Sequence, residues 1–324
     1  MKKQKIALFV RNGLVGHEGL NILVPKIKEI GFEPVIFNTG EILSKKGGIP
    51  ELADLGFYET ALLRDVVLPY LDARPLLLDE NDLPVDGVQY SLQHLVQLYD
   101  LEYHDVSNVN DPAFIESIKA DDRIVGGACV RILQIFKSEA IKAFKEKGFL
   151  WNLHTGVLPK YKGVHIPYRC LENGASEYGW TLHYVNEGVD TGDIIAVDSV
   201  PLDYKKSVFD TYLSMGEKGV GLILKELSNF KESGALPKAR PQTEKEKESY
   251  YTFPTAQEMT KYDEMGIRFV DIQKVPDMYA SKFSVLGTGH AQQLRMHVIE
   301  AIGDWERQKE ELPAVRTKRS SAVG

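Results

Sequence analysis

The sequence predicts an α/β fold of the Rossmann-like kind: an open, mostly parallel sheet flanked by helices, with a smaller, mainly helical C-terminal region. Two observations carry this prediction. Residues 5–10 and 32–37 are short apolar runs of strand character, whereas the apolar residues of 17–30 recur at helical spacing. A strand–helix–strand order is typical of parallel sheets, because the helix returns the chain to the same edge.

The following elements continue this rhythm. We expect strands at residues 103–106, 123–128, 148–154 and 180–185, and helices at residues 90–101, 112–119, 138–146, 167–174 and 207–230. Asn110 or Asp111 precedes Pro112, so one of them is the expected N-cap of its helix. These elements define a predicted domain over residues 1–234.

Residues 40–100 are less regular than their surroundings. Their apolar clusters at 66–68 and 76–78 are mixed with Pro69 and Pro75, and residues 80–87, which include Pro84, predict a turn-rich surface loop. We interpret this stretch as an insertion. Two roles are equally compatible with it, one wall of a substrate pocket or a surface excursion.

The composition limits the class of protein. The chain of 324 residues is 43% hydrophobic and 26% charged, and its net charge of −7 weighs against a large nucleic-acid-binding surface. No apolar run approaches the roughly 18 residues that span a bilayer, and Ile6 to Val10 is too short for a signal peptide, so we expect a cytoplasmic protein. Only Cys129 and Cys170 are present, which excludes a disulfide framework and favours buried core thiols.

The character of the sequence changes after residue 234. Residues 237–250 are polar and charge-alternating, which predicts a linker, and a capping-box pattern beginning at Thr255 opens a helix. A last amphipathic helix is expected at 291–311 and a disordered tail at 316–324. The predicted C-terminal region, residues 235–315, has more apolar helix surface than it can bury alone, which suggests a homodimer.

The strongest candidate site follows the predicted strand at 148–154. Asn152 and His154 are two residues apart, so on a strand both side chains emerge on one face. Gly156, Pro159 and Gly163 then predict a turn-rich loop at the sheet edge, where binding and catalytic residues gather.

Asp190 lies in a second glycine-flanked loop, after the predicted strand at 180–185. We expect it to be the partner of His154. Taken singly, Asn152 could cap a turn, His154 could be a core histidine and Asp190 could cap a helix. Their joint occurrence favours acyl-transfer chemistry.

A third loop, residues 11–17, joins the first strand to the first helix. Its two glycines could cradle a phosphate with backbone N–H groups, which makes Asn12 and Gly13 candidate substrate-binding residues. The loop lacks the full spacing of a dinucleotide-binding motif, so a plain turn remains the alternative.

Several motifs around these residues resemble those of the folate-dependent formyltransferases, the family that includes glycinamide ribonucleotide, methionyl-tRNA and sugar-nucleotide N-formyltransferases. The motifs are Asn-x-His at 152–154, Leu-Pro-x-Tyr-Lys-Gly at 158–163, Leu-Glu-Asn-Gly at 171–174, Glu-x-x-Asp-Thr-Gly at 187–192 and Val-Arg-Ile-Leu at 130–133. Together they cover roughly residues 120–200. The resemblance implies the same fold.

The resemblance also implies roles for individual residues. Asn152, His154 and Asp190 match the family's catalytic positions. The implied folate pocket comprises Val130, Arg131, Ile132, Leu133, Val185, Glu187, Val189, Thr191 and Gly192. Arg131 could equally be a salt-bridged structural arginine; His165 could reach the acceptor, although a core role is favoured for it and for His183.

The implied reaction transfers a formyl group from N10-formyltetrahydrofolate to a primary amine, without a metal ion. A protonated His154 and the amide of Asn152 would stabilise the oxyanion, and Asp190 would orient His154. The favoured acceptor is a nucleotide-linked amino sugar. A hydroxyornithine-type amino acid, methionyl-tRNA, or water in a formyltetrahydrofolate hydrolase are the alternatives, and neither a membrane nor nucleic acid is an expected partner.

Overall fold

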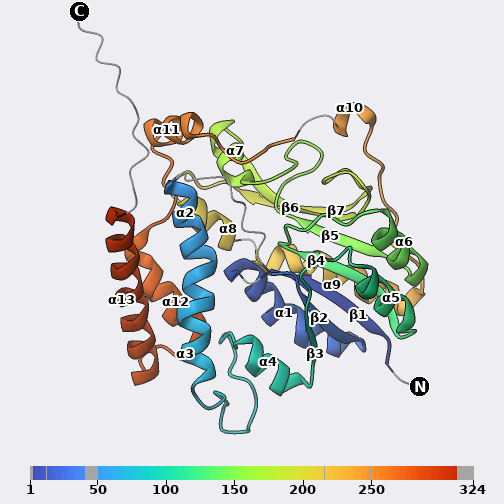
Figure 1. Ribbon diagram of the computed structural model, residues 1–324, viewed down its shortest axis with the longest axis horizontal. Coiled ribbons are helices and arrows are strands. Elements are labelled where there is room, and N and C mark those ends of the chain that lie inside the picture. The colour runs from blue at the N-terminus through green and yellow to red at the C-terminus, as the bar shows by residue number, and fades with distance from the viewer. Residues whose placement is uncertain (1–2, 12, 41–49, 215, 248–249, 312–324) are drawn as a thin grey trace, which may run out of the picture.

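A computed structural model describes residues 3–11, 13–40, 50–214, 216–247 and 250–311. Seven strands form one sheet in the order β3-β2-β1-β4-β5-β6-β7 (Figure 1). The strands are β1 (Lys5–Val10), β2 (Glu33–Asn38), β3 (Glu102–Asp105), β4 (Ile124–Val130), β5 (Leu150–His154), β6 (Glu177–Tyr184) and β7 (Ile194–Pro201). The first five strands pair in parallel and β6 and β7 are antiparallel, which confirms the mostly parallel α/β sheet.

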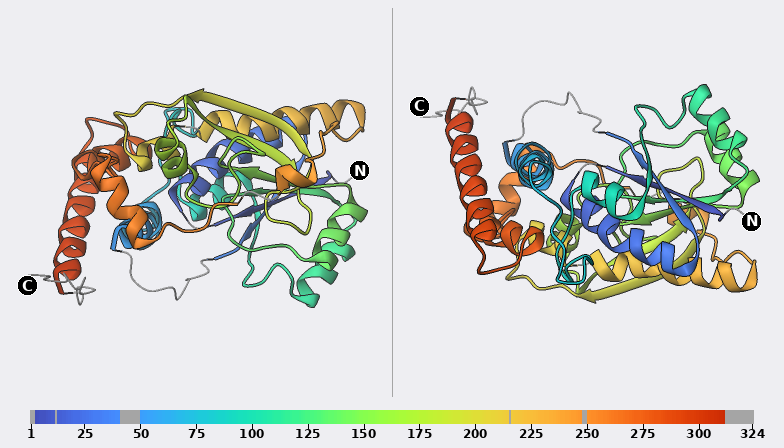
Figure 2. Two further views of the ribbon diagram at one scale, coloured as in Figure 1. Left: turned by 90° about the horizontal axis from the view of Figure 1, so that it is seen from above. Right: turned by 90° about the horizontal axis from the view of Figure 1, so that it is seen from below.

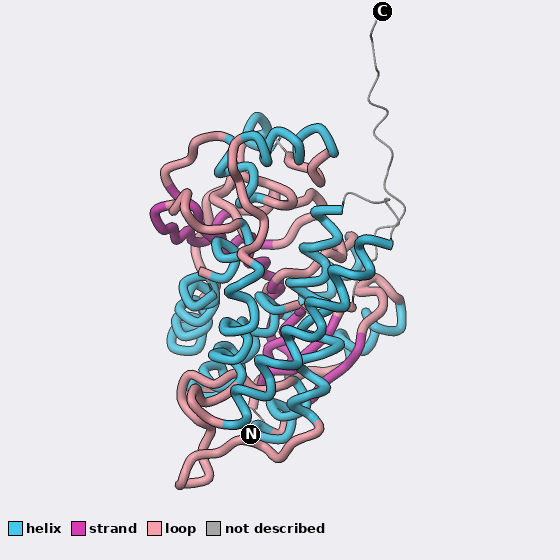
Figure 3. The backbone as a smooth tube through the Cα atoms, turned by 90° about the vertical axis from the view of Figure 1, so that its left-hand side faces the viewer, coloured by secondary structure: helices cyan, strands magenta, loops and turns pink. Residues whose placement is uncertain are grey.

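Helices surround this sheet. They are α1 (Leu14–Ile30), α2 (Pro50–Gly56), the π-helix η1 (Phe57–Val67), α3 (Leu68–Asp72), α4 (Leu92–Tyr99), α5 (Pro112–Ala120), α6 (Ser138–Lys147), α7 (Ile166–Glu172), α8 (Val208–Leu213), α9 (Gly216–Ser233), α10 (Glu244–Lys247), α11 (Ala256–Glu264), the 3-10 helix η2 (Ile272–Lys274), α12 (Val275–Phe283) and α13 (Gly289–Glu311). Figure 3 shows them arranged around the strands.

Strand alternation divides the core between the two faces of the sheet. Ile6 and Leu8 of β1 face the side that α1 and α9 cover, whereas Phe9 faces the side of α5 and α6. Phe9 packs against Phe37 at a ring-centroid distance of 5.2 Å. Burying such apolar area is the main stabilising contribution to the sheet.

A helical layer lies beside the sheet and joins distant parts of the chain. The helix that runs through α2, η1 and α3 packs against α12 and α13, as Figures 1 and 2 show. Leu62 of η1 and Leu294 and Val298 of α13 are buried in one cluster. Pro69 stands in the first turn of α3, directly after η1, so this part of the stretch that is irregular in sequence is helical.

This packing also changes the argument for a homodimer. The apolar faces of α12 and α13 are covered within the chain, by each other and by η1. The dimer was expected because these helices have more apolar surface than they can bury alone. Most of that surface is buried within the chain. Met296 and Leu286 remain exposed on this layer.

Three further expectations differ from the structure. The half-exposed edge strand β7 was not predicted, because its burial does not alternate cleanly. The helix expected at 207–230 is two helices, α8 and α9. The expected linker at 237–250 contains α10 and a β-bridge between Arg240 and Ile194, so its charged composition was misleading.

The remaining expectations for these elements agree with the structure. Asp111 is the N-cap of α5, accepting from the backbone N–H groups of Ala113 and Phe114. Cys129 and Cys170 are free and buried. The tail expected at 316–324 lies outside the described residues. Over the described ranges, no helix is both long enough and apolar enough to cross a bilayer.

Candidate active site

A cavity of about 300 Å³ lies where β1, β4 and β5 end at the same edge of the sheet. Arg11 follows β1, Arg131 follows β4, and Asn152 and His154 belong to β5; all four line the cavity. The carboxyl edge of a parallel sheet is the usual place for a binding site in this fold class. The strand order therefore brings polar side chains from three separate parts of the chain to one cavity.

Asn152 is held by a histidine on the neighbouring strand. Asn152 and His183 are opposite each other in the β5–β6 register, and the Asn152 Nδ2 atom lies 3.0 Å from His183 Nε2. His183 Nδ1 lies 2.8 Å from the carbonyl oxygen of Tyr184, so it carries the hydrogen and Nε2 accepts from the amide. This arrangement fixes the amide rotamer and leaves the second N–H of Asn152 available to the cavity.

His154 lies between two oxygen atoms. Its Nε2 donates to the carbonyl oxygen of Tyr161 at 2.6 Å, and its Nδ1 lies 3.3 Å from Asp190 Oδ2. The structure thus brings together the histidine and the carboxylate that the sequence paired. With Nε2–H engaged, Nδ1 is the nitrogen of a neutral ring that can accept a proton.

Asp190 is a buried carboxylate with several partners. Burial alone would raise its pKa, but the charge of His154, the nearby ring of His183 and the hydrogen bond from the backbone N–H of Gly163 lower the pKa of Asp190 to about 2. Its own backbone is left-handed, with φ at 53°. Asp190 is therefore ionised throughout the physiological pH range.

The protonation state of His154 differs from the one expected. Burial lowers the pKa of His154 below its ordinary 6.5, and the nearby charge of Asp190 only partly offsets this. The resting form at neutral pH is thus the neutral imidazole rather than the expected cation. A proton gained at Nδ1 would then face the ionised Asp190.

Glycine and a buried glutamine shape the Asp190 loop. A Cβ atom on Gly192 would lie 1.7 Å from the carbonyl oxygen of Tyr184, so no larger residue fits there. The Gln242 side chain, in the segment expected to be a linker, donates to the backbone carbonyls of Asp190 at 2.9 Å and Gly192 at 2.8 Å. Sequence reasoning missed Gln242, because nothing local marks it.

The residues expected to form a folate pocket divide into two groups. Those that line the cavity are Arg131, Ile132, Leu133, Val185 and Val189. Those that do not line it are Val130 in the core, Glu187 bonded to Ser138, Thr191 bonded to Asn186, and Gly192 against Tyr184. The cavity wall also includes Gln134, Ile135 and Phe136, which extend the predicted Val-Arg-Ile-Leu motif.

The Arg131 guanidinium is engaged in an ion pair. It bonds to Glu59 of η1 and lies over the ring of Tyr212 at 4.5 Å. Burial would lower the pKa of Arg131, but the charge of Glu59 outweighs it and raises that pKa. Arg131 was expected either to line the folate pocket or to be a salt-bridged structural arginine. Its side chain forms a salt bridge, and η1 supplies the partner, Glu59.

The three candidates for acceptor binding have different outcomes. Asn12 lies outside the described residues. Gly13 closes the loop after β1 by donating from its N–H to the carbonyl oxygen of Arg11 at 2.8 Å. His165 is buried at the N-cap of α7 and packs edge-on against Phe253 at 5.0 Å; it does not line the cavity.

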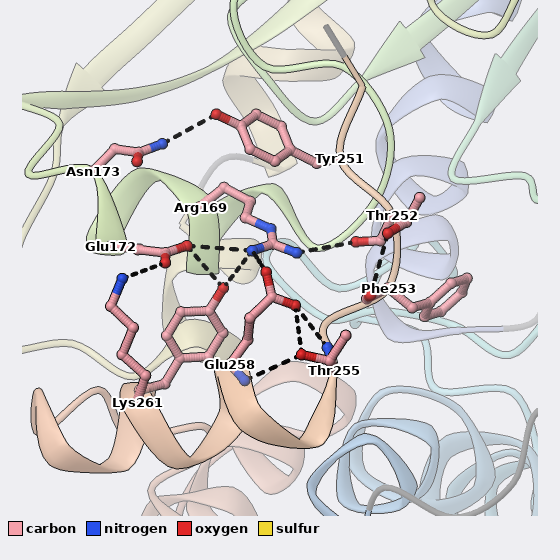
Figure 4. A network of polar contacts seen from close by, with 10 residues as sticks. Arg169, Glu172, Asn173, Tyr251, Thr252, Phe253, Thr255, Glu258 and Lys261 are labelled. Carbon is pink, nitrogen blue, oxygen red and sulfur yellow. Dashed lines mark hydrogen bonds and ion pairs between the residues drawn. The ribbon is translucent and has the colours of Figure 1, made fainter.

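Two aromatic residues of the C-terminal part complete the wall. Tyr250 and Phe253 line the cavity, yet both remain nearly half-exposed. Figure 4 shows how the segment that carries Phe253 is tied to α7. Arg169 bonds to Glu258, Glu172 and the backbone carbonyl of Thr252, and Thr255 caps α11.

No group of three or more metal-ligating side chains occurs over the ranges that the structure describes. The polar side chains that line the cavity include the Asn152 amide, two imidazoles, one carboxylate and two guanidiniums. An amide N–H beside a neutral imidazole and an ionised carboxylate suits a reaction that develops an oxyanion and moves a proton.

Comparison with known proteins gives a family match over part of the chain. Residues 93–226 match the family model described as formyl transferase. The chain is 50% identical over 56 residues, 17% of its own length and 4% of the relative, to the trifunctional purine biosynthetic protein adenosine-3 of Drosophila pseudoobscura pseudoobscura. It is 30% identical over 135 residues, 40% of this chain and 39% of the relative, to the methionyl-tRNA formyltransferase of Chlamydia pneumoniae.

Partial similarity to solved structures was also found. A sugar 3N-formyl transferase crystallised with dTDP and 5-N-formyl-THF gives a TM-score of 0.47 at 21% identity, over 78% of this chain and 70% of that one. An N-formyltransferase from Helicobacter canadensis in complex with folinic acid and dTDP-3-aminofucose gives 0.46 at 18% identity, over 90% and 79%.

The chain spans only part of the length of these relatives. The match covers 4% of each of the first three and 39% of the Chlamydia pneumoniae protein. The stretch that matches the family model contains β4 to β7 and therefore Arg131, Asn152, His154, His183 and Asp190. Over residues 93–226, which are less than half of the chain, the sequence is similar to the formyl transferase family.

Proposed function

We propose that the protein transfers a formyl group from N10-formyltetrahydrofolate to a primary amine, with Asn152, His154 and Asp190 at the reacting centre. The arrangement of Asn152 at the cavity wall, with its amide held by His183 beside the His154–Asp190 pair, carries this proposal. The similarity of residues 93–226 to the formyl transferase family supports the reaction class.

In the proposed reaction, the nitrogen lone pair of the amine attacks the formyl carbon. A bond forms between them, and the carbonyl oxygen becomes an oxyanion that accepts a hydrogen bond from the free N–H of Asn152. Collapse of this intermediate breaks the bond between carbon and N10 of the folate. The products are a formamide and tetrahydrofolate, so one proton moves from the amine nitrogen to N10.

His154 is the proposed carrier of that proton. Because burial keeps it neutral, Nδ1 can accept the proton from the attacking amine. The resulting imidazolium is then stabilised by Asp190 at Nδ1 and by the Tyr161 carbonyl at Nε2, and it returns the proton toward N10. Direct transfer of this kind needs no covalent enzyme intermediate.

The donor is proposed to enter on the side of Ile132, Leu133, Ile135, Phe136, Val185 and Val189. These residues supply an apolar wall for a flat ring, next to the amide and the imidazole. The cofactor is thus N10-formyltetrahydrofolate, and the mechanism uses no metal.

The acceptor is proposed to be a small molecule, and a nucleotide-linked amino sugar is favoured. The exposed rings of Tyr250 and Phe253 offer stacking surfaces for a base or sugar at the cavity mouth. Among the described residues beyond 234, the regular elements are helices and isolated bridges, and the net charge of −7 weighs against a tRNA acceptor.

The test is an end-point assay with N10-formyltetrahydrofolate and a panel of amines, followed by mass spectrometry. The panel contains dTDP- and UDP-amino sugars, hydroxyornithine, glycinamide ribonucleotide and methionyl-tRNA. We expect one acceptor to gain a single formyl group, and we expect His154→Ala to abolish the gain. Tetrahydrofolate formed at the same rate with and without every amine would instead identify a hydrolase.

The expected homodimer through the C-terminal region, and the cytoplasmic location, stay predictions. Met296 and Leu286 are the exposed apolar residues that a dimer contact on α13 and the loop before it would cover. Sedimentation of the protein at micromolar concentration tests this contact, and a monomer at all concentrations would contradict it.

A further inference from the structure

The chain after α9 braces two loops of the reacting centre. In Figure 1 it rises from the end of α9 to α10 at the top of the view. Arg240 forms a backbone bridge with Ile194 at the start of β7, and both N–H···O distances are 2.8 Å. Tyr251 pairs with the loop after β5, because its N–H donates to the carbonyl oxygen of Lys162 at 2.9 Å and its carbonyl accepts from the N–H of Val164 at 3.0 Å. The chain is therefore anchored at two points beside the reacting centre.

Gln242 lies between these two anchors and is only 3% exposed. Its Nε2 donates to the backbone carbonyls of Asp190 at 2.9 Å and Gly192 at 2.8 Å. Its Oε1 is buried without a hydrogen-bond partner in the part of the chain that the structure describes. Leaving a buried acceptor unpaired costs stability, so the oxygen does not explain why the amide is placed here. Both donor hydrogens of the amide go to the Asp190 loop.

The Asp190 loop needs such support. Asp190 has a left-handed backbone, with φ at 53°, which is unfavourable for a residue with a side chain and persists only where the surroundings hold it. Gln242 binds backbone carbonyls of the loop, whereas the Asp190 carboxylate faces His154 Nδ1 at 3.3 Å and the N–H of Gly163 at 2.8 Å. The distance between the carboxylate and the imidazole therefore depends on where Gln242 holds the loop.

We propose that Gln242 is a positioning residue for formyl transfer, which holds the Asp190 carboxylate at His154 Nδ1 through the backbone of the Asp190 loop. The inference rests on the proposed function, because His154 is the proton carrier of that reaction. Gln242 does not line the cavity, so it acts through Asp190 and not on a substrate. Because the attraction between charges falls with distance, a displaced carboxylate would stabilise the imidazolium less.

The other charged and titratable groups around His154 come from different elements. Burial lowers the pKa of His154, the charge of Asp190 opposes this, and His183 and Arg131 lower the pKa further. His183 belongs to β6 and Arg131 follows β4, whereas Asp190 lies in the loop that the glutamine bonds. Loss of the glutamine should therefore weaken the contribution of Asp190 and lower the pKa of His154.

The experiment uses the full chain, with its histidines labelled with ¹³C at Cε1, and follows the imidazole signals by NMR from pH 5 to 8 without any ligand. His154→Ala assigns the His154 signal. Gln242→Met removes both donors at nearly constant volume, and Gln242→Asn keeps the amide on a shorter side chain.

Two further variants are controls. Arg240→Met breaks the ion pair with Glu246 at 3.1 Å, in the same segment and without touching the Asp190 loop. Gln97→Met makes the same chemical change at an exposed position of α4.

We expect the His154 titration to move to lower pH in Gln242→Met, to move less in Gln242→Asn, and to stay in place in the two controls. In the amine assay, kcat of Gln242→Met should fall by about tenfold or more with little change in KM, and the acid limb should move to lower pH together with the NMR titration. A merely structural role would lower the amount of active protein by one factor at every pH and would leave the limb in place.

An unchanged His154 titration in folded Gln242→Met would overturn the proposal. Equal shifts in Gln242→Met and Arg240→Met would also overturn it, because the effect would then belong to the segment and not to the amide. If circular dichroism shows that Gln242→Met does not fold, Gln242→Asn is judged by the same two outcomes.

The NMR titration needs no substrate, so it separates this inference from the proposed function. If the titration moves as expected and no amine of the panel is formylated, the positioning of Asp190 stands and the proposed reaction is wrong. If an amine is formylated while the titration and kcat of Gln242→Met equal those of the unsubstituted protein, formyl transfer stands and the positioning role is wrong.

Discussion

The side-chain amide of Asn152 donates to Nε2 of His183 at 3.0 Å, across the antiparallel pair β5–β6. The amide can turn its oxygen or its nitrogen toward the cavity, and this hydrogen bond decides between them. With Nδ2 held by His183, one N–H remains for an oxyanion. His183 therefore acts as a positioning residue for Asn152.

Replacing His183 should lower turnover without unfolding the protein. In His183→Phe the acceptor for the amide is lost, so Asn152 samples both rotamers and kcat should fall by about tenfold, with little change in KM. Asn152→Ala removes the donor itself and should cost about 100-fold or more. His104→Phe, on the exposed edge strand β3, is the control and should retain normal turnover. Equal losses in all three variants would argue against the positioning role.

The pH dependence of turnover should report His154. Its pKa is lowered by burial and Asp190 is ionised above about 2, so we expect activity to be constant near neutrality and to fall as the pH drops through a value below 6.5. The negative charge of Asp190 raises the pKa of His154 against the effect of burial. Asp190→Asn removes this charge, so the pKa of His154 falls further. The acid limb should then move to lower pH and kcat should fall by about 100-fold or more.

The measurement is a pH–rate profile from pH 5 to 9 with the best acceptor of the panel. An acid limb that lies above 6.5 in the unsubstituted protein, or that stays in place in Asp190→Asn, would contradict the assignment of the limb to His154.

Stability should decline in mild acid because of His17. Its Nε2 is hydrogen-bonded to the Tyr90 carbonyl at 2.7 Å, but burial lowers its pKa to about 4. Below about pH 6.5 the unfolded chain binds a proton at His17 that the folded chain does not bind, so stability falls as the pH drops from 6.5 toward 4. The full effect is about 3 kcal/mol by this linkage.

Urea unfolding at pH 7, 6 and 5 tests this prediction. His17→Gln keeps a donor for Tyr90 and removes the titration, so its stability should depend less steeply on pH than that of the unsubstituted protein. His104→Gln should leave the slope unchanged. A slope in His17→Gln as steep as in the unsubstituted protein would assign the acid sensitivity to other groups, such as His165.

Two glycines of α9 give a matched pair for packing. A Cβ atom on Gly219 would lie 2.9 Å from the ring of Trp180, whereas nothing lies within 4 Å of one on Gly221. Gly219→Ala should therefore lower the unfolding free energy by about 1–3 kcal/mol through overpacking. Gly221→Ala should raise it by about 0.5–1 kcal/mol through helix propensity. Denaturant unfolding of the two variants measures both, and equal effects would rule out the Trp180 contact as the cause.

Much of the sheet could be predicted because its strands and helices carry local patterns. The apolar runs of β1 and β2, the N-cap at Asp111 and the spacing of Asn152 and His154 are all short-range signals, and the structure places these elements as expected. The edge strand β7 lacks such a pattern. The helix at 50–72 was hidden by its proline, which stands in a tolerated position.

The rest of the cavity could not be predicted, because its members meet only in the folded chain. Glu59 and Arg131 are 72 residues apart, and Gln242 and Asp190 are 52 apart. A buried ion pair or a side chain bonded to a distant carbonyl leaves no periodic trace in the sequence. His183 is the exception, because the antiparallel register places it opposite Asn152 once the two strands are paired.

The helical layer has a consequence for how the cavity is made during synthesis. The η1 helix, which supplies Glu59, is translated early, yet it is covered by α13, whose Glu306 and Trp305 bond to Tyr58 and Asp54 across 248 and 251 residues. Until the ribosome has released α13, the partner of Arg131 has no stable support. The sheet can form first, but the charged end of the cavity is assembled last, when the most distant parts of the chain have met.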